Sequence, residues 1–426
     1  MSVVVVRLWS VANRYRLYPG GEAERVMRDL HCAHARYVWN LAVEQQSWWR
    51  PGRGPVPGAA ERQRQLAEAR QAEPWLREGS SLVQQHALRD YDRALAAFFD
   101  PANPARKPGF RSKRRTQGFV VRDVRARRVS RHWGEVFVPK CGWVRFRWSR
   151  PLPANPGMAR VTLDRAGRWH VSFPAAQPAI GRAPGPRPAV GIDRGVRTAL
   201  VTSGGQHYRA PRISGRDAGR YLALQRKLAR QEPGSKRRDK TRRKMSAVTA
   251  RVVARRRDWA EKISTGLVAG HDLIVLEKLA IPAMTRKPRP KPDPDKDGAY
   301  LPNRARAKAG LNKGILASAW GALGTRAKQK AESSSVSVVF VDPRFTSQQC
   351  RACGHTAPEN RESQAVFTCV ACGHGDHADA NAARNILARG LTLTTGEAVP
   401  ARNPGHGNKR PRKTARAGAD TTRSAA

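Results

Sequence analysis

The sequence predicts an α/β protein in which a sheet carrying acidic residues is joined to a separate β-barrel and to a small metal-binding knuckle. Three observations predict this architecture. Two short apolar segments each end in a carboxylic acid, at Asp193 and at Glu277. Between residues 107 and 174, apolar and basic residues alternate with the period of two that is typical of strands. Two Cys-x-x-Cys pairs then lead into Asp379, which opens a segment with helical periodicity.

The chain has 426 residues, enough for two or three domains, and its formal net charge is +47. A positive charge of that size indicates an extended polyanionic partner, and nucleic acid is the obvious candidate. A membrane surface is disfavoured because the sequence has neither a lipidation signal nor a lipid-facing amphipathic helix. No apolar run reaches the ~18 residues of a membrane span. Val3 to Val6 is too short for a signal peptide and is predicted to be a strand.

The N-terminal part of the chain is predicted to be a β-barrel interrupted by a helical unit. Residues 1–20 and 105–180 supply the barrel, and residues 21–104 supply helices, one of them capped by Ser80. The barrel strands alternate arginine with aromatic residues, as in the segment Trp143 to Trp148. Such a surface offers charge for phosphates and rings for stacking on bases. Half-buried strands with solvated arginines would give the same pattern.

The sheet with the acidic residues is predicted to begin after a Pro-rich linker. Ala189 to Asp193 is an apolar strand with an acid at its end, and His271 to Leu279 repeats the pattern with Glu277. A carboxylate on an apolar strand is costly unless a metal or another partner compensates it. Metal ligation is therefore favoured over a structural role for these acids.

Basic residues between and before the strands are expected to contact nucleic acid. Residues 214–270 form long helices in which Arg251, Arg255 and Arg256 lie on a basic face opposite an apolar stripe. A solvated charged face is the alternative, although such faces usually mix signs and this one does not. Lys113 and Arg114, just ahead of the barrel strands, belong to the same expected contact surface.

The two cysteine pairs predict a structural zinc site. Cys350 and Cys353 are separated by fifteen residues from Cys369 and Cys372, and each pair can chelate an ion from one tight turn. Four thiolates close the coordination shell, which is typical of a structural ion and not of a catalytic one. Two disulfides or four unrelated buried thiols are the alternatives. The remaining two cysteines are expected to be small apolar fillers, consistent with a reducing cytoplasm.

Three acids are expected to converge, namely Asp193, Glu277 and Asp379. Two of them end strands and the third begins a helix, so a helix laid across the sheet would bring them together. This arrangement, with its order of strands and helices, is that of the RNase H-like fold. Hard ions such as Mg²⁺ take oxygen ligands, and two ions roughly 4 Å apart need several carboxylates to balance their charge. In phosphodiester cleavage, one ion would activate water and the other would stabilise the departing 3′ oxygen.

Over nearly its whole length the chain resembles TnpB, the small RuvC-type nuclease that insertion sequences encode and that is related to type V CRISPR effectors. The resemblance rests on motifs that occur in the same order along the chain: Arg36-Tyr-Val-Trp-Asn40, Lys107-Pro-Gly-Phe-Arg-Ser-Lys113, Gly191-Ile-Asp193, Leu276-Glu-Lys-Leu279, Asp342-Pro-Arg-Phe-Thr-Ser-Gln348 and Asn381-Ala-Ala-Arg-Asn-Ile386. The knuckle between the last two motifs completes the match.

This resemblance implies an RNA-guided, Mg²⁺-dependent DNA endonuclease with the three acids as catalytic residues and zinc on the four cysteines. The guide RNA would come from the element's own end, and the helical unit and the wedge-like or OB-like barrel would hold it with its DNA target. The implied nuclease domain spans residues 186–344 and 376–392, with the zinc ribbon inserted at 345–375. Residues 393–426 would form a disordered basic tail. A cytoplasmic monomer is expected.

One motif departs from the usual family form. Where Asp-Arg-Asp commonly precedes Asn-Ala-Ala, this chain has His377-Ala378-Asp379. The third carboxylate is retained, and Asp376 is a poorer candidate ligand because it lies off the helix start. Two other functions stay open on the same fold: a nucleic-acid-binding regulator that does not cut, and a transposase that joins strands. The presence of all three acids favours the nuclease.

Overall fold

The computed structural model describes residues 10–50, 52, 55–113, 117–154, 156–363 and 365–395. Contacts within the chain divide it into two compact units, the first made of residues 1–186, 210–272 and 316–337, and the second of residues 187–209, 273–315 and 338–426. The predicted strand at Val3 to Val6, Arg114 and the predicted tail beyond residue 395 lie outside the described residues. No helix in the described ranges is both long and apolar enough to cross a membrane.

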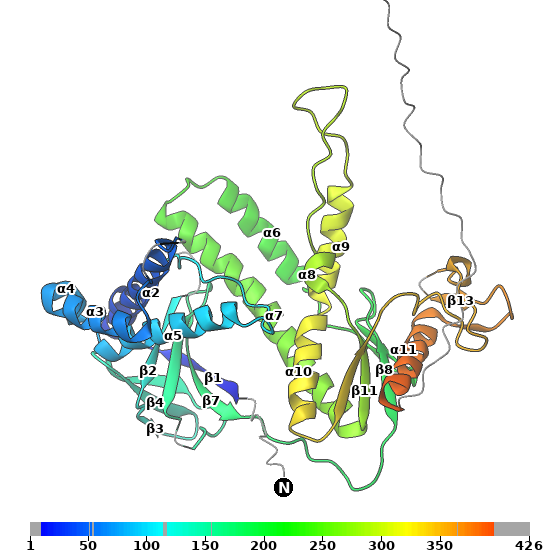
Figure 1. The fold of residues 1–426 in the computed structure, drawn as a ribbon, viewed down its shortest axis with the longest axis horizontal. Coiled ribbons are helices and arrows are strands. Elements are labelled where there is room, and N and C mark those ends of the chain that lie inside the picture. The colour runs from blue at the N-terminus through cyan, green and yellow to red at the C-terminus, as the bar shows by residue number, and fades with distance from the viewer. Residues whose placement is uncertain are drawn as a thin grey trace, which may run out of the picture. The chain divides into compact units, whose positions relative to one another are not determined.

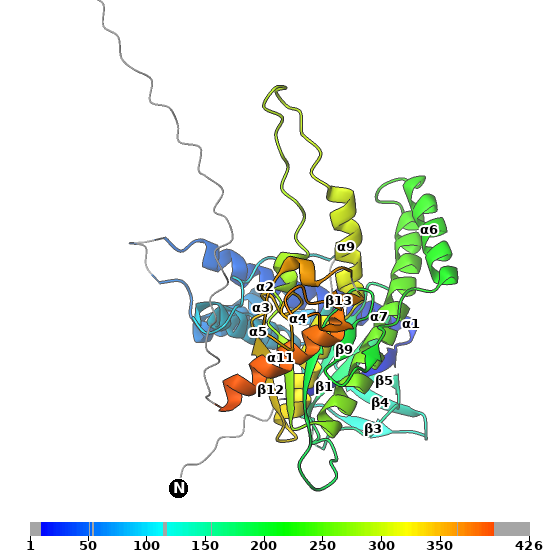
Figure 2. The same ribbon diagram turned by 90° about the vertical axis from the view of Figure 1, so that its right-hand side faces the viewer.

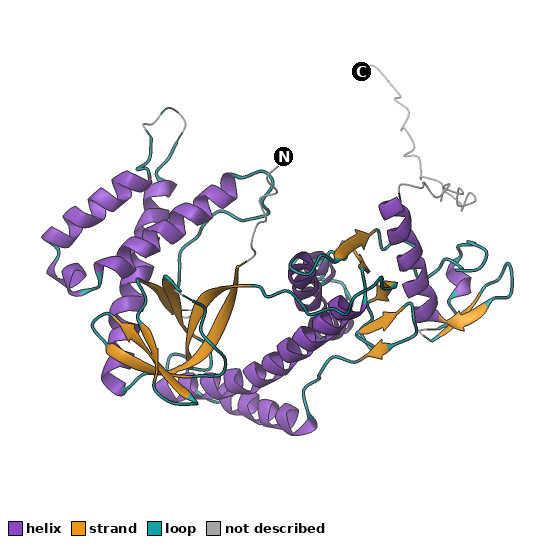
Figure 3. Cartoon of the chain, turned by 90° about the horizontal axis from the view of Figure 1, so that it is seen from below, coloured by secondary structure: helices purple, strands orange, loops and turns teal. Residues whose placement is uncertain are grey.

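The β layer of the first unit is an antiparallel sheet of seven described strands (Figure 3). In spatial order they are β2 Gln117–Arg122, β6 Met158–Leu163, β7 Trp169–Ala176, β1 Ser10–Tyr18, β5 Gly142–Arg147, β4 Trp133–Val138 and β3 Ala126–Arg128. Their side chains alternate between buried and exposed, as in β5, where Val144 and Phe146 are buried and Trp143, Arg145 and Arg147 are exposed.

The predicted barrel is therefore present as a curled sheet. Its end strands, β2 and β3, are not paired with each other among the described residues, and a barrel closes only when its end strands pair. At three residues, β3 is also the shortest strand of this sheet, so it presents few backbone groups to a further strand.

The helices between β1 and β2 form the second layer of the first unit. They are α1 Gly21–Arg25, α2 Cys32–Ser47, α3 Ala59–Ala72, α4 Pro74–Glu78 and α5 Ser81–Phe99, with a π-helical stretch at Val26–His31 that joins α1 to α2. Trp39 of α2 meets Tyr91 of α5 edge to face, with ring centroids 5.4 Å apart. Ser80 precedes α5, but its side chain makes no capping hydrogen bond, so the predicted cap is wrong. The backbone oxygen of Ser80 accepts the first hydrogen bond of the helix, from the backbone N–H of Gln84.

Two long basic helices complete the first unit together with α10 Trp320–Glu332. They are α6 Gly215–Ala229 and α7 Lys236–Gly270, which lie side by side in Figure 2. Lys330 of α10 is buried, and its ammonium group donates to the backbone oxygen of Glu261 and to the hydroxyl of Ser264 on α7. A buried lysine is tolerated here because these acceptors replace water.

The second unit is built around a five-stranded mixed sheet. In spatial order its strands are β10 His207–Tyr208, β9 Leu200–Thr202, β8 Ala189–Asp193, β11 Leu273–Glu277 and β12 Ser337–Val341. The strands predicted to end at Asp193 and at Glu277 are confirmed as β8 and β11, which pair in parallel. All five residues of β11 are buried, which explains why its sequence is an uninterrupted apolar run before its terminal acid.

Helix α11, Ala378–Thr395, lies across this sheet (Figure 1). It buries Ile386 against Val275 and Val341. Between β12 and α11 come a 3₁₀ turn at Pro358–Asn360 and the hairpin of β13 Val366–Thr368 and β14 Gly375–His377. Two further helices, α8 Ile281–Met284 and α9 Ala305–Ala317, follow β11.

Candidate active site and metal centre

The three acids that the sequence singles out lie within electrostatic reach of one another in the second unit. Because β8 and β11 run parallel with Ile192 opposite Leu276, the residues that follow, Asp193 and Glu277, leave the same edge of the sheet. Asp379 lies in the first turn of α11. The charges of both Glu277 and Asp379 act on the carboxyl group of Asp193. The structure thus joins acids that lie far apart in the sequence.

A glycine determines how closely α11 approaches the sheet. A Cβ atom on Gly191 would lie 2.2 Å from the backbone oxygen of Ala383 and 2.6 Å from the backbone nitrogen of Leu387. The backbone of α11 therefore rests directly on β8, with the small side chains of Ala382 and Ala383 fully buried. This contact explains the Gly191-Ile-Asp193 motif, because the residue that admits the helix stands two positions before the acid.

The carboxyl group of Asp193 has a pKa well above its ordinary value. Burial is the largest cause, followed by the negative charges of Glu277 and Asp379, and together they raise its pKa to about 7. The charge of Arg361 opposes this rise. A carboxyl group with such a pKa marks a place where negative charge is concentrated.

Glu277 has a raised pKa for the same main reason, its burial. Three groups oppose the rise: a hydrogen bond from the hydroxyl of Thr346 to Oε1 of Glu277, 2.9 Å long, and the charges of Arg194 and Arg389. Arg194 also donates to the backbone oxygen of Glu277. These contacts fix the carboxylate at the end of β11 and leave its second oxygen available.

Arg361 is a member of the acid cluster that sequence reasoning missed. It lies just after the 3₁₀ turn, and its guanidinium group donates to Oδ1 of Asp379 at 3.0 Å. It also acts electrostatically on Asp193. No spacing rule connects an arginine in a loop to acids on a strand and a helix, so only the folded chain reveals this neighbour.

Two asparagines of α11 hold the segment between β12 and the knuckle in place. Asn381 and Asn385 are buried and lie four residues apart on one helix face. The amide groups of both donate to the backbone oxygen of Gln349, and Asn385 also donates to that of Thr346. This positions Thr346 against Glu277. The spacing of the two asparagines was a signal in the sequence, although it did not show what they bind.

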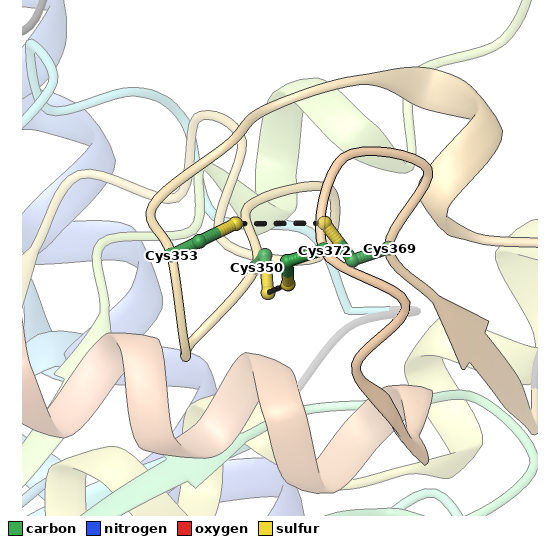
Figure 4. A group of neighbouring side chains, drawn as sticks. All are labelled: Cys350, Cys353, Cys369 and Cys372. Atoms are coloured by element: carbon green, nitrogen blue, oxygen red, sulfur yellow. Dashed lines mark hydrogen bonds between the residues drawn. The ribbon is translucent and has the colours of Figure 1, made fainter.

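The four predicted zinc ligands form a compact group (Figure 4). All four sulfur atoms lie within 4.8 Å of one another, with Cys353 and Cys369 3.6 Å apart and Cys350 and Cys372 3.8 Å apart. A tetrahedral ion with Zn–S bonds of ~2.3 Å would space its sulfur atoms by about 3.8 Å. The donor set and its spacing therefore fit a metal ion such as zinc.

The thiols of the knuckle differ in their pKa values. Burial tends to raise the pKa of Cys369, but the N–H groups of Cys372 and Ala371, together with the neighbouring thiols, bring it down to about 7. Burial raises the pKa of Cys350, and the neighbouring thiols raise that of Cys372 to about 12. Gly354 and Gly373, the residues after each pair, both have positive φ angles, 77° and 71°. Those angles let each turn fold its amide groups back toward the sulfur atoms.

The three acids are less tightly grouped than the cysteines. Among the described residues, the ligand atoms of the four cysteines lie close enough together to hold a single ion. The oxygen atoms of the three carboxylates do not. Asp376 does not join the acids, because it is ion-paired with Arg384. His377, which stands at the departure from the usual motif, meets the ring of His207 edge to face at 5.0 Å.

The basic residues expected to contact nucleic acid belong to the first unit. Arg251 and Arg255 share the carboxylate of Asp217 on α6, at 3.2 and 3.4 Å, and Arg256 donates to the backbone oxygen of Pro211. These contacts link α6 to α7 and leave excess positive charge on the pair. Lys113 is exposed.

Two family models match parts of the chain. One described as "Probable transposase" matches residues 172–287, which include Asp193 and Glu277. The other, described as "Cas12f1-like, TNB domain", matches residues 320–386, which include the four cysteines and Asp379.

Full-length relatives are similar over most of the chain. A protein of Escherichia coli (strain K12), provisionally named RNA-guided DNA endonuclease InsQ, is 31% identical over 92% of this chain and 96% of its own length. A provisionally named RNA-guided DNA endonuclease of Streptomyces pristinaespiralis is 31% identical over 90% of each chain. A solved complex of Cas12f1 with guide RNA and target DNA covers 89% of this chain and 98% of that one, but at 12% identity and a TM-score of 0.43 the likeness is too weak to build on.

Proposed function

Because this chain belongs to the TnpB family of insertion-sequence nucleases, we propose that it is an RNA-guided, Mg²⁺-dependent DNA endonuclease of a transposable element. Two relatives are named as RNA-guided DNA endonucleases, and they match 92% and 90% of this chain. The proposed nuclease domain is RuvC-like, with the RNase H-like order of strands and helices. It comprises residues 186–344 and 376–392, with a zinc ribbon inserted at 345–375.

The convergence of Asp193, Glu277 and Asp379 is the observation that carries this proposal. A site for Mg²⁺ needs carboxylate oxygens and uncompensated negative charge. Burial and the neighbouring acids raise the pKa of Asp193 to about 7, because negative charge is concentrated around it. The carboxylate oxygens fit the chemistry of the proposed metal, although they are less tightly grouped than the four cysteine sulfur atoms.

Each residue has a distinct part in the proposed mechanism. Asp193, on which the charges of both other acids act, would be one ligand of the Mg²⁺ ions. Glu277, fixed by Thr346, and Asp379, at the helix start, would supply further ligands. Bound ions would supply a nucleophilic water and stabilise the leaving 3′ oxygen of the cut phosphodiester. Arg361 would hold the carboxylate of Asp379 in place through their hydrogen bond.

Zinc would have a purely structural part, held by Cys350, Cys353, Cys369 and Cys372. Cys369 and Ala378 share a small apolar cluster, and Ala378 is the first residue of α11. An ordered knuckle would therefore help to fix the start of the helix that carries Asp379. Arg361 belongs to the same insertion, so loss of the ion would also release its contact with that acid.

The net charge of +47 supports two nucleic-acid partners. A guide RNA and a DNA duplex together carry more phosphate groups than a duplex alone, and protein cations neutralise them by displacing counterions. Lys113, Arg114, Arg251, Arg255 and Arg256 are proposed contacts. The curled sheet and the helices α1–α5 would hold the RNA and its target.

One experiment tests the proposal. The protein is expressed together with its flanking DNA, the co-purified RNA is sequenced, and the complex is offered a plasmid library with randomised target-adjacent sequence. We expect an RNA from the flank and Mg²⁺-dependent cutting that Asp193→Ala abolishes. The control variant is Glu362→Gln, which removes an exposed carboxylate of the same unit. RNA binding without any cutting would instead favour a regulator, and strand joining would favour a transposase.

A further inference from the structure

Two sequence motifs that contain none of the proposed metal ligands contact each other in the second unit. One spans residues 342–348, after β12, and the other spans residues 381–386 of α11. An amide group of the second motif donates to a backbone oxygen of the first, from Asn385 to Thr346 at 3.0 Å. We call residues 342–351 the bracing segment, because α11 holds them along their length.

Three residues of α11 hold the bracing segment, and their spacing of four puts them on one helix face. Asn381 and Asn385 both donate to the backbone oxygen of Gln349, at 2.8 and 2.7 Å. Arg389 donates to the backbone oxygen of Asp342 and to the side-chain oxygen of Gln349, both at 3.0 Å. Both asparagines are buried, so these bonds take the place of bonds to water.

The bracing segment also contains the first cysteine of the knuckle. Cys350 stands between Gln349 and Arg351, and Asn381 binds both neighbours. Its amide group donates to the backbone oxygen of Gln349, while its Oδ1 accepts from the backbone N–H of Arg351 at 3.0 Å. The knuckle therefore anchors one end of the bracing segment to α11.

Thr346 points from the bracing segment to Glu277. Both side chains are buried, with 2% and 6% of their surface exposed. The Thr346 hydroxyl lies 2.9 Å from Oε1 of Glu277 and 3.0 Å from the backbone oxygen of Pro343. A hydroxyl group has one proton to donate, and a charged carboxylate forms the stronger hydrogen bond. The hydroxyl therefore donates to Glu277 whenever that acid is ionised.

The backbone just before Thr346 has a costly conformation. Phe345 has a φ angle of 60°, in the left-handed region that bulky residues rarely adopt. Its ring is 55% exposed, so burial of the ring does not offset the cost. Conformations of this kind persist where the surrounding structure imposes them, and they cluster at functional sites. Here the turn directs the next residue, Thr346, toward an acid.

We propose that Thr346 is a positioning residue of the divalent-cation site, held by the bracing segment so that its hydroxyl keeps Glu277 in one orientation. Groups that hydrogen-bond to a metal ligand orient it and raise the affinity for the ion. The inference rests on the proposed function, because it takes Glu277 as a ligand of Mg²⁺. The alternative is that the hydroxyl only stabilises the fold, as any buried hydrogen bond does.

The test measures Mg²⁺ binding to the full chain, freed of nucleic acid, by calorimetric titration. The variants are Thr346→Val, which removes the hydroxyl, Thr346→Ser, which retains it, and Asn385→Leu, which loosens the bracing segment without touching an acid. Thr202→Val is the matched control, because Thr202 is also 2% exposed but its hydroxyl accepts from the backbone N–H of Gln206 at 3.0 Å. Thermal unfolding checks that each variant is folded.

We expect Thr346→Val to weaken Mg²⁺ binding about 10–100-fold, the loss typical of a group that orients a metal ligand, and Thr346→Ser to restore most of it. Asn385→Leu should also weaken Mg²⁺ binding. Thr202→Val should lower the unfolding temperature and leave Mg²⁺ affinity unchanged. Unchanged or tighter binding by Thr346→Val, or an equal loss for Thr202→Val, would overturn the proposal. Full affinity in Asn385→Leu would overturn the part assigned to the bracing segment.

Asp193→Asn separates this inference from the proposed function. If that variant binds Mg²⁺ as tightly as the natural protein, the acids are not the cation site, and the proposed function fails together with the inference. If Asp193→Asn loses Mg²⁺ while Thr346→Val retains it, only the inference fails. Both readings come from cation binding alone, so they do not require a guide RNA or a cut substrate.

Discussion

Replacing Asp193 by asparagine should stabilise the metal-free protein at high pH. The pKa of this carboxyl group is raised from 3.8 to about 7 in the folded chain. At ~1.36 kcal/mol for each pKa unit, ionised Asp193 costs about 4 kcal/mol of folding free energy. The side chain keeps some contact with water, and screening reduces the expected cost to about 2 kcal/mol. Asparagine has the same shape and no charge, so it avoids this cost.

The free-energy cost of ionised Asp193 depends on pH, because the pKa of this group is higher in the folded chain than in the unfolded chain. Above pH 7 the carboxyl group is ionised in both the folded and the unfolded chain, so the full cost applies. Between pH 7 and 3.8 the folded chain holds its proton while the unfolded chain has lost it, and the cost shrinks steadily with falling pH. At pH 5 it should be less than half of its value at pH 8, and below 3.8 it should vanish.

Thermal unfolding in magnesium-free buffer provides the measurement. At pH 8, Asp193→Asn should raise the unfolding temperature by roughly 4–8 °C, the change that about 2 kcal/mol causes in a domain of about 150–250 residues. Added Mg²⁺ should stabilise the natural protein and not the variant, because the variant lacks a ligand. Glu362→Gln, which removes an exposed carboxylate, is the control. It should neither raise the unfolding temperature nor abolish the stabilisation by Mg²⁺. A variant that is less stable than the natural protein at pH 8 would refute the reasoning.

Three further perturbations follow from the same contacts. Gly191→Ala should lower the free energy of unfolding by roughly 1–3 kcal/mol, because its Cβ would lie 2.2 Å from the backbone of α11. Gly204→Ala is the control and should be nearly neutral, since its Cβ would have no neighbour closer than 3.8 Å. Equal losses for the two variants would show that α11 does not rest on β8. Cys369→Ser should reduce bound zinc from about one ion per chain to a small fraction, measured by elemental analysis, and full retention would exclude this knuckle as the site. Arg361→Gln removes a positive charge that lowers the pKa of Asp193, so the pH of half-maximal Mg²⁺-dependent cleavage should rise by up to about one unit; an unchanged pH profile would contradict the electrostatic contact.

The sequence was informative wherever one side chain recurs at a fixed spacing. Doubled Cys-x-x-Cys pairs can be recognised from the sequence because two residues within one turn necessarily lie close together, and the folded chain brings the four sulfur atoms together as expected. Strands β8 and β11 could be predicted because a short apolar run that ends in an acid is typical of a buried strand that leads into a site. A local signal was less reliable at Ser80, which precedes α5 as a cap residue would but whose side chain makes no capping hydrogen bond.

What the sequence determined by itself is the set of chemical groups: three acids, four thiols and a large excess of positive charge. Tertiary structure alone decided which groups share a site. It brought Arg361 to Asp379, and Thr346 to Glu277 through the asparagines of α11. In the part of the chain that the structure describes, it also left the predicted barrel as a curled sheet whose end strands do not pair with each other. The physical reason is that spacing fixes neighbours only within one turn or strand, whereas contacts between distant segments depend on how closely their backbones can pack, as they do at Gly191.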